Sequence, residues 1–201
     1  GIGLNEPVAA EQIQGWQREL PAALLERERG LRADMDAFSR LLPLRVGDVV
    51  KVPCYTPHAL QHGVRTVEFQ TPVYERKILS FAQKVLTQEE WDTEEAVALM
   101  ALEPQQEAPF AVCYRGDGVL IERIVFFDDF QVERWQLQPG RVHVLCPQGS
   151  YALVMVVDGE AALNGTRLGA EQACLVPGSM ADAPLSQQGE KTATLLVARP
   201  A

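Results

Sequence analysis

The clearest strand pattern of the chain runs from "GVLIERIVFF" at residues 118–127 to "ATLLVARP" at residues 193–200. Apolar and polar residues alternate in it, as they do in strands with one buried face. The segments between are "FQVERWQL" (130–137), "RVHVLC" (141–146), "YALVMVVDG" (151–159), "EAALNG" (160–165) and "ACLVP" (173–177). They recur about every 8 to 12 residues, separated by glycine, proline, asparagine or aspartate. This rhythm predicts a β-sandwich or barrel.

The composition is that of an ordinary globular protein. The chain has 201 residues, of which 47% are hydrophobic and 22% are charged, so wholesale disorder is excluded. We find no apolar run of the roughly 18 residues needed to cross a bilayer, and no signal-peptide pattern. The net charge of −9 would repel phosphate backbones, so we expect neither nucleic acid nor a membrane as a partner.

Cysteines and histidines set limits on metal chemistry. Cys54, Cys113, Cys146 and Cys174 form no CxxC pair, so we expect free thiols and a cytoplasmic protein. The histidines are His58, His62 and His143. A catalytic zinc takes about three protein ligands, so any metal site needs ligands other than these histidines or from outside the chain. We expect His143 to face solvent or a barrel mouth and Trp135 to be a core anchor, and we assign His143 no role.

The first part of the chain, residues 1–45, has helical spacing. Pro21 interrupts the apolar run, so we expect two pieces or a kink there. Gly30 is the expected end of the first helix, and a second short helix is expected over residues 33–42. A further helix is predicted over "TQEEWDTEEAVALM" (87–100), with Thr87 and Glu90 as its capping box, and residues 103–109 are the predicted linker.

Between the helical stretches the pattern changes to that of strands. "LRVGDVVKVP" (44–53) predicts a turn followed by a strand, and "VRTVEFQ" (64–70) and "VYERKILSF" (73–81) alternate as half-buried strands do. The segment at 45–59 also echoes "RLGAEQACLVPGSMADA" (167–183), since both have a basic residue, a turn glycine, a strand, a proline and a turn. A repeated half-barrel would give this echo, and so would chance.

The most specific motif is "VGDVVKVPCYTPHALQHG" (46–63), in which a glycine turn, a short strand and a proline turn precede His58. It resembles the second signature of the cupin superfamily, where the histidine is a metal ligand inside a small barrel. Gly63, the triplet Glu68-Phe69-Gln70 and Arg76 follow, and with them the chain resembles type I phosphomannose isomerases. The fold that this resemblance implies is mainly β, with cupin-type double-stranded β-helix (jelly-roll) barrels and an N-terminal helical segment.

The same resemblance implies roles for five residues. His58 would bind the metal, zinc or another divalent ion. Glu68 would transfer the proton between adjacent carbons of the sugar phosphate, and Arg76 would stabilise the enediolate or bind the phosphate. Gln70 and Lys77 would contact the substrate. The alternative is a polar surface with an ordinary Glu–Arg pair and a hydrogen-bonded core histidine, and we expect Cys54 to be a buried thiol.

The departures from the isomerase pattern leave two hypotheses open. The upstream glutamine, histidine and glutamate ligands have no counterpart before residue 45. One hypothesis is therefore a fragment of a mannose-6-phosphate isomerase-like enzyme; the other is a non-catalytic cupin that binds a small molecule or sugar, or dimerises. We predict a helical segment over 1–45, the second half of a catalytic-type barrel plus a helix over 46–102, and a metal-free barrel over 110–201. A homodimer is the predicted assembly.

Overall fold

The computed structural model describes residues 21–61, 63–71, 77, 93–103, 108–147 and 149–201. The chain divides into two compact units. The N-terminal unit comprises residues 1–62 and 75–103, and the jelly-roll unit comprises residues 63–74 and 104–201. No helix in the described part of the chain is long and apolar enough to cross a membrane.

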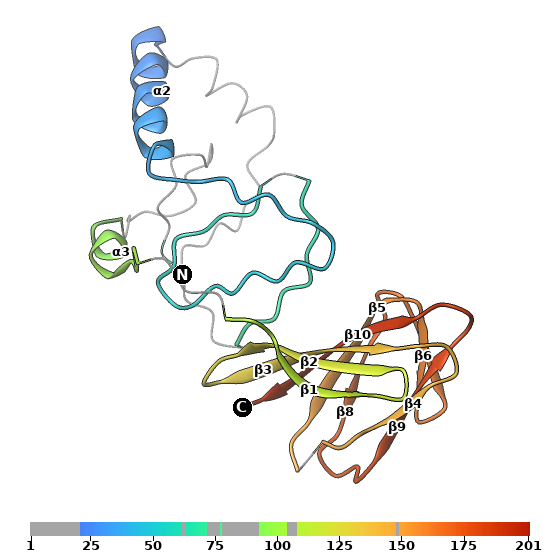
Figure 1. The fold of residues 1–201 in the computed structure, drawn as a ribbon. Coiled ribbons are helices and arrows are strands. Elements are labelled where there is room, and N and C mark those ends of the chain that lie inside the picture. Colours follow the sequence, from blue (N-terminus) through green and yellow to red (C-terminus); the bar gives the residue numbers. More distant parts are fainter. Residues whose placement is uncertain (1–20, 62, 72–76, 78–92, 104–107, 148) are drawn as a thin grey trace, which may run out of the picture. The chain divides into compact units, whose positions relative to one another are not determined.

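The jelly-roll unit contains two antiparallel sheets (Figure 1). The strands are β1 (Ala111–Gly116), β2 (Val119–Phe126), β3 (Phe130–Leu137), β4 (Val142–Leu145), β5 (Ala152–Asp158), β6 (Glu160–Leu163), β7 (Thr166–Gly169), β8 (Ala173–Val176), β9 (Ala183–Gln188) and β10 (Ala193–Pro200). One sheet has the order β1-β2-β3-β10-β5-β8, and the other has the order β4-β9-β6-β7. From β3 to β10 this is the strand order of a jelly roll, and the β1–β2 hairpin extends its first sheet. The mainly β fold class predicted from the sequence is confirmed.

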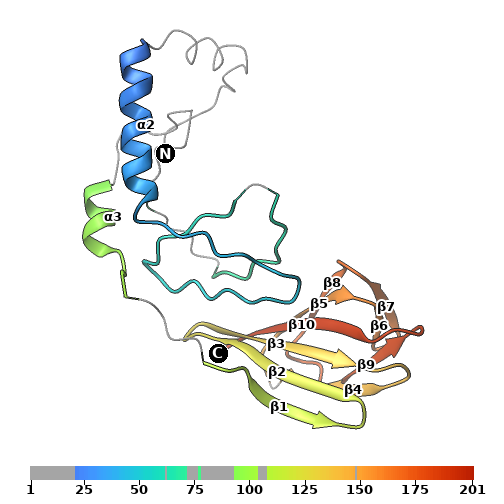
Figure 2. The ribbon, with the colours of Figure 1, turned by 45° about the horizontal axis from the view of Figure 1, so that its top comes forward.

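The core lies between the two sheets, which face each other in Figure 2. Each strand contributes alternate residues to it, as the period of two requires. Leu137, Val154, Val156, Leu185, Leu195 and Val197 are among the side chains with no exposed surface. Seven of the strands coincide with segments predicted above, whereas β1, β7 and β9 were not singled out in the sequence. Trp135 is buried, as predicted for a core anchor.

Two helices lie in the described part of the N-terminal unit, α2 (Ala22–Asp36) and α3 (Thr93–Leu99). α2 begins directly after Pro21, and the helical piece expected before this residue lies outside the described residues. The prediction that Gly30 ends the helix is wrong. α2 continues through Gly30 to Asp36. Gly30 lies on an open side of the helix, since nothing lies within 4 Å of the place where its Cβ would be. The predicted second helix over 33–42 is therefore only the end of α2.

The strands expected between residues 44 and 71 are absent from the described residues. Residues 44–61 and 63–71 carry no helix or strand, only turns and extended chain. The apolar side chains of this part, such as Val46, Val50 and Val67, are exposed. Cys54 is exposed too, which corrects the expectation of a buried thiol. The predicted strand at 73–81 and the capping box at Thr87 and Glu90 lie outside the described residues, Lys77 excepted.

Candidate functional site

Four of the five residues implied by the isomerase resemblance lie in the described part of the chain. His58 lies exposed in a loop, where its Nδ1 is 2.8 Å from the backbone oxygen of Thr56. Glu68 and Gln70 are exposed on the extended segment. Lys77 forms an ion pair with Glu95 at 2.6 Å. Arg76 lies outside the described residues, and the roles of all five stay predictions.

The described residues also do not fit a zinc site. They contain no group of three or more histidine, cysteine, aspartate or glutamate side chains that could hold a metal ion. A catalytic zinc takes about three protein ligands. His58 therefore finds no companion ligands in the part of the chain that the structure describes.

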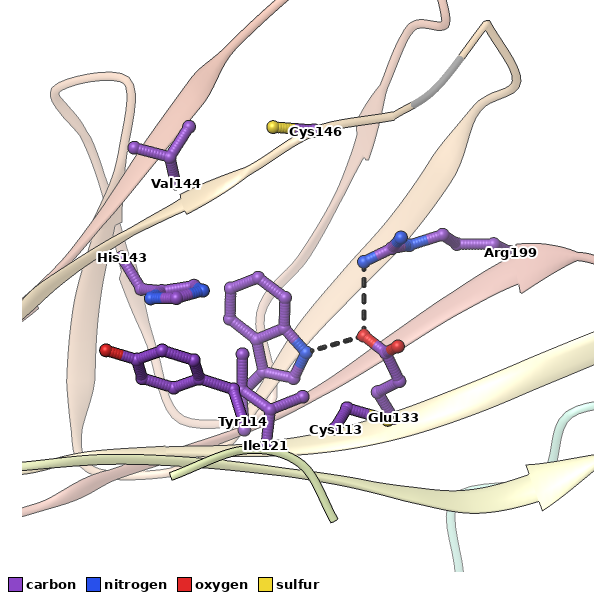
Figure 3. A pocket seen from close by; sticks show the side chains of 9 residues that line it. Cys113, Tyr114, Ile121, Glu133, His143, Val144, Cys146 and Arg199 are labelled. Carbon is purple, nitrogen blue, oxygen red and sulfur yellow. Dashed lines mark hydrogen bonds and ion pairs between the residues drawn. The ribbon is translucent and has the colours of Figure 1, made fainter. Parts of the chain in front are cut away.

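A cleft of about 290 Å³ opens instead at one end of the jelly roll (Figure 3). Side chains from four strands of the larger sheet and from β4 of the smaller sheet line it. They are Cys113, Tyr114, Ile121, Glu133, Trp135, His143, Val144, Cys146 and Arg199. Its volume is near the lower end of those of small-molecule sites, about 300 to 1,000 Å³.

The polar floor of the cleft is the continuation of the core-facing rows of β3 and β10. On β3, Leu137 and Trp135 face the core, and the next residue on this face is Glu133. On β10, Leu195 and Val197 face the core, and the next is Arg199. Strand pairing places Glu133 opposite Val197, so Arg199 is its diagonal neighbour. Two opposite charges thus replace apolar side chains where the core ends.

Glu133 is the centre of a buried hydrogen-bond network. Its Oε2 accepts a hydrogen bond from the indole Nε1 of Trp135 at 2.9 Å and one from Nη2 of Arg199 at 3.1 Å. Burying a carboxylate is unfavourable unless it is paired, and here the guanidinium and the indole provide the pairing. Arg199 keeps an Nε that is buried without a hydrogen-bond partner.

Aromatic side chains form the wall beside this network. The centroid of the His143 ring lies 4.7 Å from that of Tyr114, in tilted geometry, and 5.2 Å from that of Trp135, in edge-on geometry. A register shift in β1 between Val112 and Tyr114 lets both Cys113 and Tyr114 line the cleft. Burial lowers the pKa of His143, and the charge of Glu133 opposes this shift. The imidazole is therefore neutral at pH 7.

The thiol of Cys146 lies on the β4 side of the cleft. It donates a hydrogen bond to Oδ1 of Asp182 at 3.4 Å. This hydrogen bond raises the pKa of the thiol, so Cys146 is protonated at neutral pH. A protonated thiol is a weak nucleophile. Cys146 thus contributes a polarisable surface to the cleft rather than a reactive anion.

Sequence reasoning found β2, β3, β4 and β10, which carry most of this cleft, but neither β1 nor the role of the residues that line it. Trp135 was expected in the core, and His143 was expected at a barrel mouth or in solvent without a role. Glu133, Arg199 and Tyr114 were not singled out. The signal that could have found two of them is a charged residue in the apolar phase of a predicted strand, at Glu133 in "FQVERWQL" and at Arg199 in "ATLLVARP".

Comparisons with known proteins concern the fold. No protein-family model matches the sequence, and no curated protein matches it. Similar solved structures include the cupin_2 domain of an XRE family transcriptional regulator from Enterobacter cloacae, at 16% identity and a TM-score of 0.38, over 41% of this chain and 96% of that one. An RmlC-like cupin from Shewanella frigidimarina gives 17% identity and a TM-score of 0.38, over 45% and 83%.

KdgF from a Halomonas species gives 14% identity and a TM-score of 0.38, over 46% of this chain and 87% of that one. The likeness is one of fold. At such identities and scores it supports no statement about activity, and the jelly roll is established by its own strand order. The resemblance to phosphomannose isomerases depends on the sequence motif of residues 46–81.

Proposed function

We propose that the jelly-roll unit binds a small, electrically neutral molecule with a ring-shaped or planar face in the cleft between β1, β3, β4 and β10. The proposal is the non-catalytic alternative of the sequence analysis. The observation that carries it is the Glu133–Arg199 pair beneath the aromatic wall of Tyr114, His143 and Trp135.

The charges of the cleft favour a neutral ligand. Glu133 and Arg199 compensate each other within 3.1 Å, and His143 is neutral because burial lowers its pKa. An anion such as a sugar phosphate would be attracted by Arg199 but repelled by Glu133 at nearly the same distance. A neutral molecule avoids this conflict and still meets donors and acceptors on the floor.

The wall favours a ligand with an apolar face. Aromatic rings bind the flat faces of sugars, bases and other rings through apolar contact, while polar groups at one end fix the orientation. Within the described part of the chain, no hydrogen bond occupies the ring nitrogens of His143 or the hydroxyl of Tyr114. Both groups are available to the hydroxyl or amide groups of a bound molecule.

Isomerisation of a sugar phosphate has less support. It stays a prediction from the sequence of residues 46–81, where the implied residues His58, Glu68 and Gln70 are exposed. Moving a proton between adjacent carbons requires a positioned base and an electrophile at the carbonyl oxygen. A metal ion could act as this electrophile, but the described residues contain no group of three or more histidine, cysteine, aspartate or glutamate side chains that could hold one.

Ligand-observed NMR on the full chain tests the proposal. The panel consists of neutral monosaccharides, nucleosides and cyclic amides, with mannose 6-phosphate and other phosphates as their anionic counterparts. We expect a neutral ring compound to bind. Tyr114→Ala should weaken it at least about tenfold, because the substitution removes half of the wall around His143. The control is Tyr55→Ala, which removes an exposed tyrosine of the N-terminal unit.

Two results would contradict the proposal. One is the absence of binding by every neutral compound, and the other is equal loss of binding in both tyrosine variants. If the full chain with added zinc converts mannose 6-phosphate to its ketose, the isomerase hypothesis replaces ours.

A further inference from the structure

The polar floor of the cleft has a free hydrogen-bond acceptor and a free donor. Both hydrogen bonds to Glu133, from Trp135 and from Arg199, end at its Oε2, and the one from Arg199 comes from Nη2. Among the described residues, nothing donates to Oε1 of Glu133, and nothing accepts from Nη1 of Arg199. The buried side-chain atoms without a partner in this part of the chain are Oγ1 of Thr56 and Nε of Arg123 and Arg199. Oε1 of Glu133 and Nη1 of Arg199 are therefore open to solvent.

These two free atoms flank the ion pair. Oε1 shares a carbon with Oε2 of Glu133, Nη1 shares one with Nη2 of Arg199, and the paired atoms Oε2 and Nη2 are 3.1 Å apart. A carboxylate acceptor and a guanidinium donor form stronger hydrogen bonds than neutral groups do. A ligand that meets this floor therefore needs an N–H or O–H group for Oε1 and, beside it, an acceptor for Nη1.

The rest of the lining offers few partners for further polar groups. Figure 3 shows Glu133 and Arg199 together at one side of the cleft, away from Val144. Ile121 and Val144 are aliphatic, and a thiol such as that of Cys113 is a weak donor. A monosaccharide carries hydroxyl groups around its whole ring and would bury some of them against these side chains without a hydrogen bond, which is unfavourable. A ring with a single polar edge avoids this cost.

We propose that the ligand of this cleft is a cyclic amide, whose N–H group donates to Oε1 of Glu133 and whose carbonyl oxygen accepts from Nη1 of Arg199. The ring of a cyclic amide holds its N–H and C=O groups on the same edge, as the floor requires. The remaining ring atoms are apolar and suit the wall of Tyr114, His143 and Trp135. This assignment rests on the proposed function, because it names the class of neutral ring compound that the same cleft would bind.

Three small rings test the polar edge. They are 2-piperidone, which has both groups; cyclohexanone, in which a methylene group replaces the N–H; and N-methyl-2-piperidone, in which a methyl group blocks it. Ligand-observed NMR on the full chain measures the dissociation constant of each. We expect 2-piperidone to bind at least about tenfold more tightly than either analogue, because the analogues leave Oε1 of Glu133 without a donor.

Glu133→Gln should abolish this preference. The N–H groups of Trp135 and Arg199 both need the single side-chain oxygen of glutamine, so its NH2 group would replace the free acceptor with a donor. 2-Piperidone should then bind no more tightly than cyclohexanone. Glu122→Gln is the matched control, because Glu122 is also paired with an arginine, Arg134 at 2.8 Å, but does not line the cleft. This variant should keep the wild-type preference.

Unfolding midpoints in urea establish that both variants are folded before their binding is compared, and the comparison of the three rings in the wild type needs no variant. Equal binding of all three rings by the wild type, with binding still weakened by Tyr114→Ala, overturns the cyclic-amide assignment and leaves the proposed function standing. A monosaccharide that binds more tightly than 2-piperidone also overturns the assignment, and so does loss of the preference in Glu122→Gln. If no neutral ring compound binds, the proposed function is refuted and the assignment with it.

Discussion

Two segments with the same sequence pattern behave differently in this molecule. "RVGDVVKVP" (45–53) and "RLGAEQACLVP" (167–177) each combine a basic residue, a turn glycine, an apolar run and a proline. The second contains most of β7 and all of β8, which pair with β6 and β5, respectively. The first carries no strand. An apolar pattern therefore forms a strand only where a second strand hydrogen-bonds to its backbone and a second sheet packs against its apolar face.

Burial makes the same contrast. Leu168 and Val176 in the second segment are 7% and 1% exposed, whereas Val46 is fully exposed and Val50 is 48% exposed in the first. Among the described residues of the N-terminal unit, the buried hydrophobic side chain is Ala96. Since burial of apolar surface is the main favourable term in folding, stability should be concentrated in the jelly-roll unit.

The strongest test of this contrast is a matched pair of leucine truncations. Leu195→Ala leaves a cavity in the jelly-roll core and should lower the free energy of unfolding by about 2–5 kcal/mol. Leu42→Ala, at an exposed position of the N-terminal unit, should change it by less than about 0.5 kcal/mol. Urea unfolding followed by Trp135 fluorescence, in a chain with Trp16 and Trp91 changed to Phe, measures both. Equal losses of unfolding free energy in Leu195→Ala and Leu42→Ala would contradict the expected difference between the two units.

The two ion pairs should differ next. Glu133→Gln leaves the buried Arg199 without its counter-charge and should lower the free energy of unfolding by about 1–3 kcal/mol. Glu95→Gln removes the more exposed pair with Lys77 and should lower it by at most about 1 kcal/mol. The same urea experiment compares them, and a larger effect at Glu95 would contradict the expected order.

Glycine-to-alanine substitutions should have opposite signs in the two units. At Gly159 the backbone φ is +76°, and a Cβ would lie 2.8 Å from the backbone oxygen of Thr192, so Gly159→Ala should destabilise the jelly roll by about 1–2 kcal/mol. Gly30 lies inside α2 with open space around it, so Gly30→Ala should stabilise the helix by about 0.5–1 kcal/mol. Urea midpoints and helical circular dichroism measure the two effects; a stabilised Gly159→Ala chain would be inconsistent with this packing.

The smallest expected effect is a pH dependence at His143. Burial lowers its pKa in the folded state, so the unfolded state binds the proton more readily. The folded state with a neutral His143 is therefore at its most stable above the unfolded pKa of about 6.5, and the free energy of unfolding decreases as the pH falls below that value. The urea midpoint of the wild type should therefore fall more steeply than that of His143→Gln between about pH 7.5 and 5. His58→Gln, which removes an exposed imidazole, is the control, and identical slopes in all three chains would refute the expectation.

Local pattern predicted most of the jelly roll because its strands alternate clearly. β3, for example, begins and ends at the residues of the predicted segment. β9 was missed because Pro184 and a run of polar residues argue against a central strand, although β9 pairs with both β4 and β6. β7 has only four residues, and β1 carries a register shift, which weakens its alternation.

The cleft could not be predicted in the same way. Tyr114, Glu133, His143 and Arg199 lie on four different strands, so their proximity depends on long-range pairing. The motif at residues 46–63 is locally specific, yet in the described part of the chain the hydrogen-bond partner of its His58 is the backbone oxygen of Thr56. Local specificity of a motif does not supply the neighbours that a site requires.

Sequence alone predicted seven of the ten strands of the jelly roll, since alternation indicates which face of a strand is buried wherever the strand forms. It also determined the acidic surface and the free thiols, which follow from composition and spacing. That residues 46–61 and 63–71 form no strand depends on tertiary structure, because a strand needs a partner that its own residues cannot provide. The tertiary structure also decided that a charge pair and an aromatic wall meet at the end of the core, because strand order joins residues that are distant along the chain.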